Sequence, residues 1–219
     1  TRTVVAMKDT SGADLTVKVT GYQWKWGYEY VDGPAAGVKF LSNLTTPAAQ
    51  IENREPKGPF YLMKVDKPLV VPVGKKIRVA VTAGDVIHSW MVPDLAVKQD
   101  AIPGFIRSSW FRAEKVGEYR GQCAELCGKD HAFMPIAIRI VSPEKYAEWL
   151  VEAKKKLRLR QERGGIGGDP VEDLGVGDTE VQIGALFFEQ QRFECAAPVV
   201  EIAQQRFQRI DQVAAHGAA

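Results

Sequence analysis

The chain contains few cysteines and few histidines. Only three of its 219 residues are cysteine and three are histidine, and no run of about eighteen consecutive apolar residues occurs. Three cysteines cannot form a disulfide framework. The missing apolar run excludes a membrane-spanning helix within this sequence. Because the first residue is Thr1 and not methionine, we expect a processed or truncated start.

The charge balance is nearly neutral. There are 29 basic and 27 acidic residues, which gives a net charge of +2. No basic block is interleaved with aromatic residues, as a nucleic-acid groove would require. We therefore expect no nucleic-acid partner. The 45% hydrophobic content is enough for one domain with its own core plus extensions.

Apolar residues recur with period two from Leu15 to about Ile140, which is typical of strands with one buried face. By this alternation, Trp24, Trp26, Tyr28 and Tyr30 share one face of a strand. The alternating runs are separated by glycine- and proline-containing turns, without helical periodicity between them. This pattern predicts an all-β fold, an antiparallel sandwich or barrel.

The periodicity changes at Ser142. Ser-Pro-Glu is typical of a helix start, and apolar residues then recur at helical spacing as far as Leu157. We predict a domain over 1–158 that is closed by this helix, a glycine-rich linker over 159–180 and a tail over 181–219. The tail has the spacing of one or two short amphipathic helices and contains Cys195, and the sequence assigns it no function.

Four sulfur and nitrogen donors lie close together in the sequence. Cys123, Cys127, His131 and Met134 have the spacing C-x3-C-x3-H-x2-M and lie between two expected strands, one around Tyr119 and one beginning at Pro135. Thiolate, imidazole and thioether suit copper or zinc and suit magnesium or calcium poorly. A further imidazole is available from His88, in DVIHSW, at the end of another strand signal.

Several interpretations of this cluster are open. Cys123 and Cys127 would close only a small disulfide ring, which adds little stability, and buried structural thiols are a further alternative. Zinc bound by both cysteines, His131 and His88 is a stronger alternative but leaves Met134 unexplained. Copper electron-transfer sites use a weak axial thioether, and two cysteines with two histidines favour two coppers with bridging thiolates.

The stretches YQWKWGYEY, HSWMVPDLAVKQDAIPG and GQCAELCGKDHAFMPI, in this order, resemble subunit II of haem-copper cytochrome c oxidases over about residues 15–155. The resemblance implies a cupredoxin Greek-key β-barrel that holds the dinuclear copper centre CuA. It implies the following ligands: bridging Cys123 and Cys127, terminal His88 and His131, weakly bound Met134, and the backbone carbonyl of Glu125.

The resemblance also implies an electron-transfer role within a respiratory oxidase. Electrons would enter from cytochrome c at Trp24 and leave to the haem of a partner subunit. Acidic residues near the docking surface would be Glu29, Asp32 and Asp85. The Glu125 carboxylate would contribute to a magnesium or manganese site at the boundary with subunit I.

The implied location is the periplasmic face of the bacterial inner membrane, or the intermembrane-space face of the mitochondrial inner membrane. The paired N-terminal transmembrane helices of this family are missing here, so we expect attachment through helices outside this sequence or through partner subunits. The sequence contains no C-x-x-C-H motif, so we expect no covalent haem.

Two other functions fit parts of the pattern. One is the CuA domain of a nitric oxide or nitrous oxide reductase, although Glu125 favours an oxidase because a carboxylate suits the neighbouring hard-metal site. The other is a non-redox zinc- or copper-binding module, such as a copper chaperone. Met134 and the donor count for two coppers argue against zinc.

Overall fold

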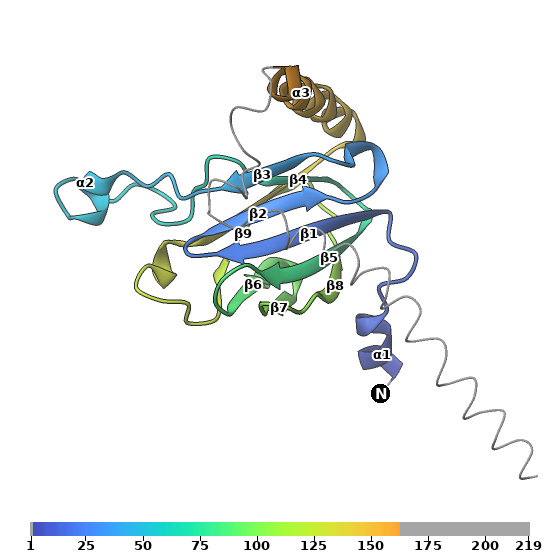
Figure 1. The fold of residues 1–219 in the computed structure, drawn as a ribbon, viewed down its shortest axis with the longest axis horizontal. Coiled ribbons are helices and arrows are strands. Elements are labelled where there is room, and N and C mark those ends of the chain that lie inside the picture. Colours follow the sequence, from blue (N-terminus) through green and yellow to red (C-terminus); the bar gives the residue numbers. More distant parts are fainter. Residues whose placement is uncertain (1, 163–219) are drawn as a thin grey trace, which may run out of the picture. The chain divides into compact units, whose positions relative to one another are not determined.

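The computed structural model describes residues 2–162, and side chains as far as residue 159. The described part contains two β-sheets, with α3 packed at one edge (Figure 1). Its elements are α1 (Arg2–Lys8), β1 (Leu15–Tyr22), β2 (Lys25–Tyr30), η1 (Gly33–Ala35), β3 (Lys39–Ser42), α2 (Ala48–Ile51), β4 (Leu69–Pro72), β5 (Lys76–Ala83), β6 (His88–Val92), η2 (Pro93–Leu95), β7 (Val97–Ala101), β8 (Arg107–Arg112), β9 (Gly117–Cys123), η3 (His131–Phe133), β10 (Pro135–Val141) and α3 (Pro143–Glu162).

The strand order is β3-β2-β1-β5-β8 in the first sheet and β4-β10-β9-β6-β7 in the second. The all-β prediction is confirmed. The antiparallel prediction is only partly correct, because β1 pairs with β5 and β10 pairs with β4 in parallel. The chain crosses repeatedly between the sheets, and such long connections allow strands that are distant in sequence to lie parallel.

The predicted alternation matches the buried faces of the strands. Trp26, Tyr28 and Tyr30 of β2 all lie in the core between the sheets. Trp24 is not part of the strand: it lies in the turn between β1 and β2, where it is half-buried and packs against the same core. The alternation placed Trp24 within the strand, whereas the chain reverses direction directly after Tyr22 and β2 begins only at Lys25.

The predicted closing helix is present as α3. The Ser142 hydroxyl accepts a hydrogen bond from the Lys145 amide at 3.4 Å, as expected for a helix cap. The Trp149 ring packs against the Tyr30 ring with centroids 5.3 Å apart, which fixes α3 to the core. α3 extends to Glu162 and so includes the first four residues of the predicted linker. The rest of the linker, and the predicted tail with Cys195, lie outside the described residues.

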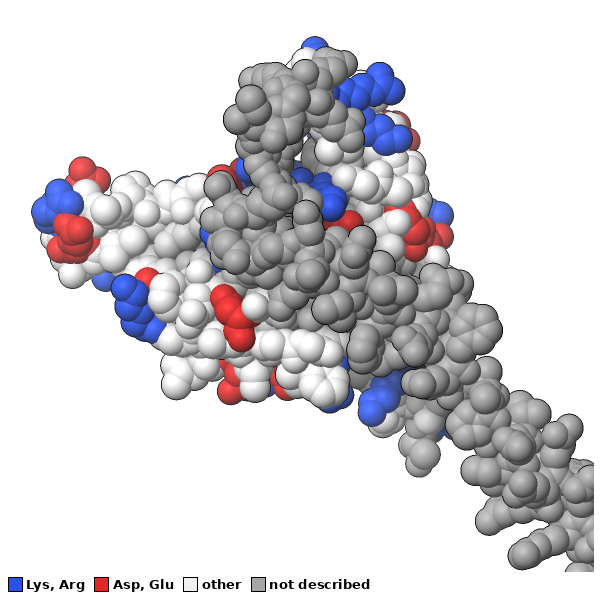
Figure 2. Space-filling view, in the orientation of Figure 1, with Lys and Arg blue, Asp and Glu red and all other residues white. Residues whose placement is uncertain are grey.

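Charged side chains of both signs lie at the tip of the arm that carries α2, and lysine and arginine side chains gather around α3 (Figure 2). No helix among the described residues has the length and apolarity needed to cross a membrane.

One buried hydroxyl connects the two sheets. The Tyr30 hydroxyl, on β2 of the first sheet, donates to the Val70 carbonyl at 2.7 Å and accepts from the Val70 amide at 3.1 Å. Val70 lies on β4, which is an edge strand of the second sheet. The side chain of Tyr30 therefore satisfies backbone groups that have no further strand to pair with.

Replacing Tyr30 with phenylalanine (Tyr30→Phe) should leave both Val70 groups buried without this partner. We expect the free energy of unfolding to fall by about 1–3 kcal/mol, measured by urea denaturation of the metal-free protein. Tyr119→Phe is the control, because its hydroxyl bonds the Lys115 carbonyl at the exposed surface, and its effect should stay within about 0.5 kcal/mol. Equal losses in the two variants would contradict the cross-sheet role.

Candidate metal centre

The predicted ligand loop connects β9 to β10. Cys123 is the last residue of β9, His131 opens η3, and Met134 lies directly before β10. The loop is closed at its base, since the Cys123 amide donates to the Met134 carbonyl at 3.2 Å. The sequence prediction of a short loop between two strands is confirmed.

The pairing of β6 with β9 brings His88 to this loop. Trp90 lies opposite Cys123 in the antiparallel register, and the Ala124 amide donates to the Ser89 carbonyl at 3.0 Å. His88 is the first residue of β6, whereas the sequence pattern indicated a position at the end of a strand. At this position its side chain is fully buried beside the cysteines.

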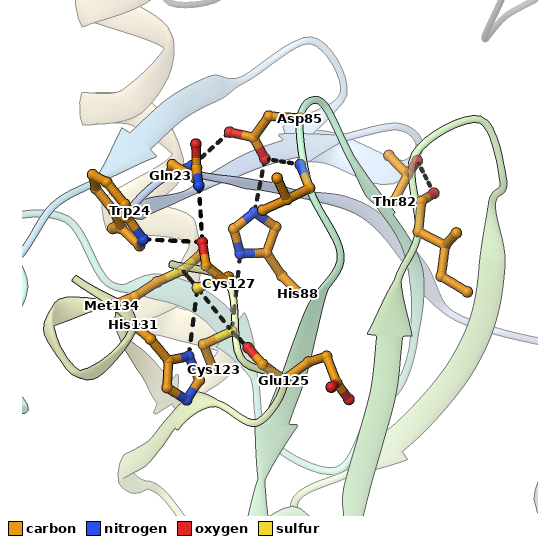
Figure 3. A network of polar contacts seen from close by, with 12 residues as sticks. Gln23, Trp24, Thr82, Asp85, His88, Cys123, Glu125, Cys127, His131 and Met134 are labelled. Carbon is orange, nitrogen blue, oxygen red and sulfur yellow. Dashed lines mark hydrogen bonds and ion pairs between the residues drawn. The ribbon is translucent and has the colours of Figure 1, made fainter. Parts of the chain in front are cut away.

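The two thiols face each other, and each also faces its own imidazole (Figure 3). The Cys123 and Cys127 sulfurs are 3.9 Å apart. Cys123 Sγ lies 3.9 Å from His88 Nδ1, and Cys127 Sγ lies 3.4 Å from His131 Nδ1. Met134 Sδ lies 3.9 Å from the sulfur of Cys127. All five side chains that the sequence singled out as soft donors therefore meet in one cluster.

Glu125 lies at the exposed side of this cluster. Its backbone carbonyl oxygen is 3.3 Å from Cys123 Sγ. Its carboxylate points away from the sulfur atoms (Figure 3). The residue thus presents a carbonyl to the soft donors and a hard carboxylate outward.

A hydrogen-bonded turn supports Cys127 from the other side. Gln23 Nε2 donates to the Cys127 carbonyl at 2.9 Å, and Trp24 Nε1 donates to the same oxygen at 3.3 Å. Trp24 therefore contacts the ligand loop directly. Glu29 and Asp32, two of the acidic residues expected near the docking surface, do not reach the site. Glu29 lies near the end of β2 that is far from Trp24, and Asp32 lies beyond that end.

The metal-free thiols differ in acidity. Burial opposes ionisation of Cys123, but hydrogen bonds from the charged form of His88 and from the backbone outweigh it and lower its pKa to about 7. Burial, together with the nearby charge of Cys123, raises the pKa of Cys127 to about 12. Burial also disfavours the charged form of His88, but its hydrogen bonds with Cys123 and Asp85 raise its pKa overall.

These donors fit a soft metal ion. Both cysteines are free thiols, and their sulfur separation is far longer than a disulfide bond of about 2 Å. The ligand atoms of His88, Cys123 and Cys127 lie within 4.8 Å of one another, a spacing that a bound ion can bridge. Met134, 1% exposed, adds a thioether that zinc sites do not ordinarily use.

Two glycines that sequence reasoning did not single out make this geometry possible. A Cβ on Gly121 would lie 1.9 Å from the Met91 carbonyl oxygen, so β9 and β6 can approach only because that side chain is missing. A Cβ on Gly21 would lie 2.7 Å from the His88 ring. Glycine inside a strand pattern is a signal of close approach, and it was available in the sequence.

Comparison with known proteins gives a consistent result. A family model described as the periplasmic domain of cytochrome c oxidase subunit II matches residues 15–141. Cytochrome c oxidase subunit 2 of Cereibacter sphaeroides is 47% identical over 154 residues, covering 65% of this chain and 50% of that protein. The corresponding protein of Metridium senile is 43% identical over 145 residues, covering 66% and 56%. The chain thus spans about half the length of these curated relatives.

Solved structures confirm the cupredoxin-like fold. The periplasmic domain of subunit II of cytochrome oxidase (CoxB) of Bradyrhizobium japonicum matches with a TM-score of 0.59 and 49% identity, over 68% of this chain and 99% of that one. A mixed disulfide between a thioredoxin-like protein and a cytochrome c oxidase subunit II contains a similar chain, with a TM-score of 0.55 and 47% identity, over 68% of this chain and 96% of that one.

Metal binding should depend on pH because both thiols must lose their protons. At a pH below about 7, the pKa of Cys123, both thiols are protonated and a metal ion displaces a proton from each. At a higher pH Cys123 is already ionised, so the metal ion mainly displaces the proton of Cys127. We therefore expect the affinity for Cu(I) to rise with pH over about pH 6 to 9, more steeply in the acid half. Protonation of His88, whose pKa is raised, acts in the same direction.

Competition with a Cu(I) chelator under nitrogen measures this dependence. In Cys127→Ser, the rise above pH 7 should become shallower, because the proton with the raised pKa is no longer displaced. An affinity that does not change with pH would contradict thiolate coordination.

Proposed function

Because the chain belongs to the family of cytochrome c oxidase subunit II periplasmic domains, we propose that it relays single electrons from cytochrome c, through a dinuclear copper centre, to the haem of a partner oxidase subunit. The observation that carries this proposal is the paired arrangement of donors: two thiols 3.9 Å apart, each facing a different imidazole. A dicopper centre supplies a one-electron redox couple when bound.

The side chains of the chain hold this centre. Cys123 and Cys127 would hold both metal ions through their sulfur atoms, and His88 and His131 would each provide one nitrogen. Met134 and the Glu125 carbonyl are the weak ligands, a role supported by their positions near different sulfurs. The donors are attached to strand ends and to a loop closed at its base, so they move little when the charge of the site changes.

We assign electron entry to Trp24. Its half-buried ring extends from the β1–β2 turn to the Cys127 carbonyl, which is supported by the 3.3 Å hydrogen bond. Of the three acidic residues expected near the cytochrome c docking surface, Asp85 alone contacts the site residues, through His88. Glu29 and Asp32 would act only at the periphery of an interface of ordinary size.

The Glu125 carboxylate is available to a second metal. It points away from the soft donors (Figure 3), and a carboxylate suits magnesium or manganese. We propose that it contributes to such a site together with oxidase subunit I. The electron relay would operate on the periplasmic side of the membrane, or on the equivalent mitochondrial side.

Electron paramagnetic resonance of the oxidised, copper-loaded protein tests the relay directly, with a copper count on the same sample. We expect two coppers per chain and hyperfine splitting from two equivalent copper nuclei. Cys127→Ser should abolish this signal because a bridge is lost, whereas Met134→Leu should keep it and change the reduction potential. One copper with splitting from a single nucleus, or a silent zinc-containing sample, would contradict the proposal.

Trp24→Phe tests the entry residue. The substitution keeps an aromatic ring but removes the donor to the Cys127 carbonyl, so we expect slower electron transfer from reduced cytochrome c with an unchanged copper spectrum. The control is Trp110→Phe, since Trp110 lies on β8 and its indole nitrogen has no hydrogen-bond partner. Equal rates in the two variants would remove Trp24 from the path.

A further inference from the structure

The Asp85 carboxylate is directed toward His88 and Gln23, although the residue itself is exposed. It lies in the loop between β5 and β6, and both of its oxygens accept hydrogen bonds. Oδ1 lies 2.8 Å from His88 Nε2 and accepts from the Val86 amide at 2.6 Å. Oδ2 accepts from the Gln23 amide at 2.7 Å. The carboxylate therefore joins the loop before β6 to the turn between β1 and β2 (Figure 3).

The contact with His88 selects one form of its ring. An ionised carboxylate can only accept hydrogen bonds, so Nε2 of His88 must carry the proton. In a neutral imidazole the other nitrogen, Nδ1, then keeps its lone pair. Nδ1 is the atom that lies 3.9 Å from Cys123 Sγ. The tautomer selected by Asp85 thus presents the free lone pair to the sulfur cluster.

We propose that Asp85 is a positioning residue of the candidate metal centre: it holds His88 in the Nε2–H tautomer and in the orientation that points Nδ1 at the sulfur of Cys123. This role of Asp85 extends the proposed electron relay. The copper measurements below rest on that proposed function, whereas the tautomer measurement does not. A carboxylate that accepts the second N–H of a histidine ligand also makes the imidazole a stronger donor.

Packing holds the His88 ring but does not choose between its nitrogens. Gly21 leaves room for the carbon edge of the ring, since a Cβ there would lie 2.7 Å from Cδ2. Trp26 packs against the ring in an edge-to-face arrangement, with centroids 5.9 Å apart. These apolar contacts restrict where the ring lies, whereas the hydrogen bond to Asp85 decides which nitrogen is protonated.

The same carboxylate reaches the second cysteine indirectly. It accepts from the amide of Gln23, and the Gln23 side chain donates to the Cys127 carbonyl at 2.9 Å. A continuous set of hydrogen bonds therefore runs from His88 through Asp85 and Gln23 to Cys127. Loss of the carboxylate should loosen both sides of the cluster.

Nuclear magnetic resonance of the metal-free, full-length chain with 15N-labelled histidine tests the tautomer without copper. We expect His88 to show a protonated Nε2 and an unprotonated Nδ1 above its pKa. Asp85→Ala should increase the Nδ1–H form markedly, whereas Asp94→Ala should leave the spectrum of His88 unchanged. Asp94 is a matched control because it is an exposed acidic residue beyond the opposite end of β6.

Copper measurements on the same variants test the consequence. We expect Asp85→Ala to raise the Cu(I) dissociation constant about 10–100-fold, the usual range for loss of such a partner. The reduction potential should also rise, because removing a negative charge favours the reduced metal. Asp94→Ala should alter neither value appreciably. If Asp85→Ala does not fold, Asp85→Asn removes the charge and one acceptor with little change of shape.

A protonated Nδ1 in the unmodified protein above the pKa of His88 would overturn the proposal. So would an Asp85→Ala protein that folds and keeps both its His88 tautomer and its Cu(I) affinity. The tautomer is measured without metal, so this result does not depend on whether the electron-relay proposal is correct. Even a protein that binds only one metal ion can show that Asp85 controls the tautomer of His88.

Discussion

The pairing of β6 with β9 is the constraint on which the metal centre depends. It places Trp90 opposite Cys123, and thereby brings His88 next to a loop more than thirty residues further along the chain. A slip of one residue would turn the side chains of β6 to the opposite face of the sheet. The close approach requires a glycine at position 121, since any Cβ there would collide with the backbone of β6.

Three connections then meet at one end of the two-sheet core. The β1–β2 turn contributes Gln23 and Trp24, the β5–β6 loop contributes Asp85, and the β9–β10 loop contributes the thiols. Each connection is hydrogen-bonded to at least one of the others, so the site does not rely on the stiffness of a single loop. Strands with buried faces support all three connections, which suits the proposed electron relay, because such a site must hold its geometry while its charge changes.

The sequence predicted the local features well and the non-local ones poorly. Period-two alternation identified the buried faces of β1, β2, β5 and β10, and Ser142 identified the start of α3. The same alternation assigned Trp24 to the strand, although it lies in the turn before β2. It also could not predict the parallel pairing of β1 with β5, since alternation describes one strand at a time and carries no information about its neighbour.

By itself, the sequence determined which donors are available: two thiols, an imidazole and a thioether within one short loop, whose chemistry selects a soft metal wherever the loop lies. Only the tertiary structure decided how these donors are used. Contacts between segments far apart in the chain decide which strand supplies the second imidazole and which of its nitrogens faces the sulfurs. They also decide which carboxylate contacts that imidazole. Asp85 is the clearest example: in the sequence it is one of several acidic residues, and only the packing of β6 beside β1 and β9 places its oxygens between His88 and Gln23.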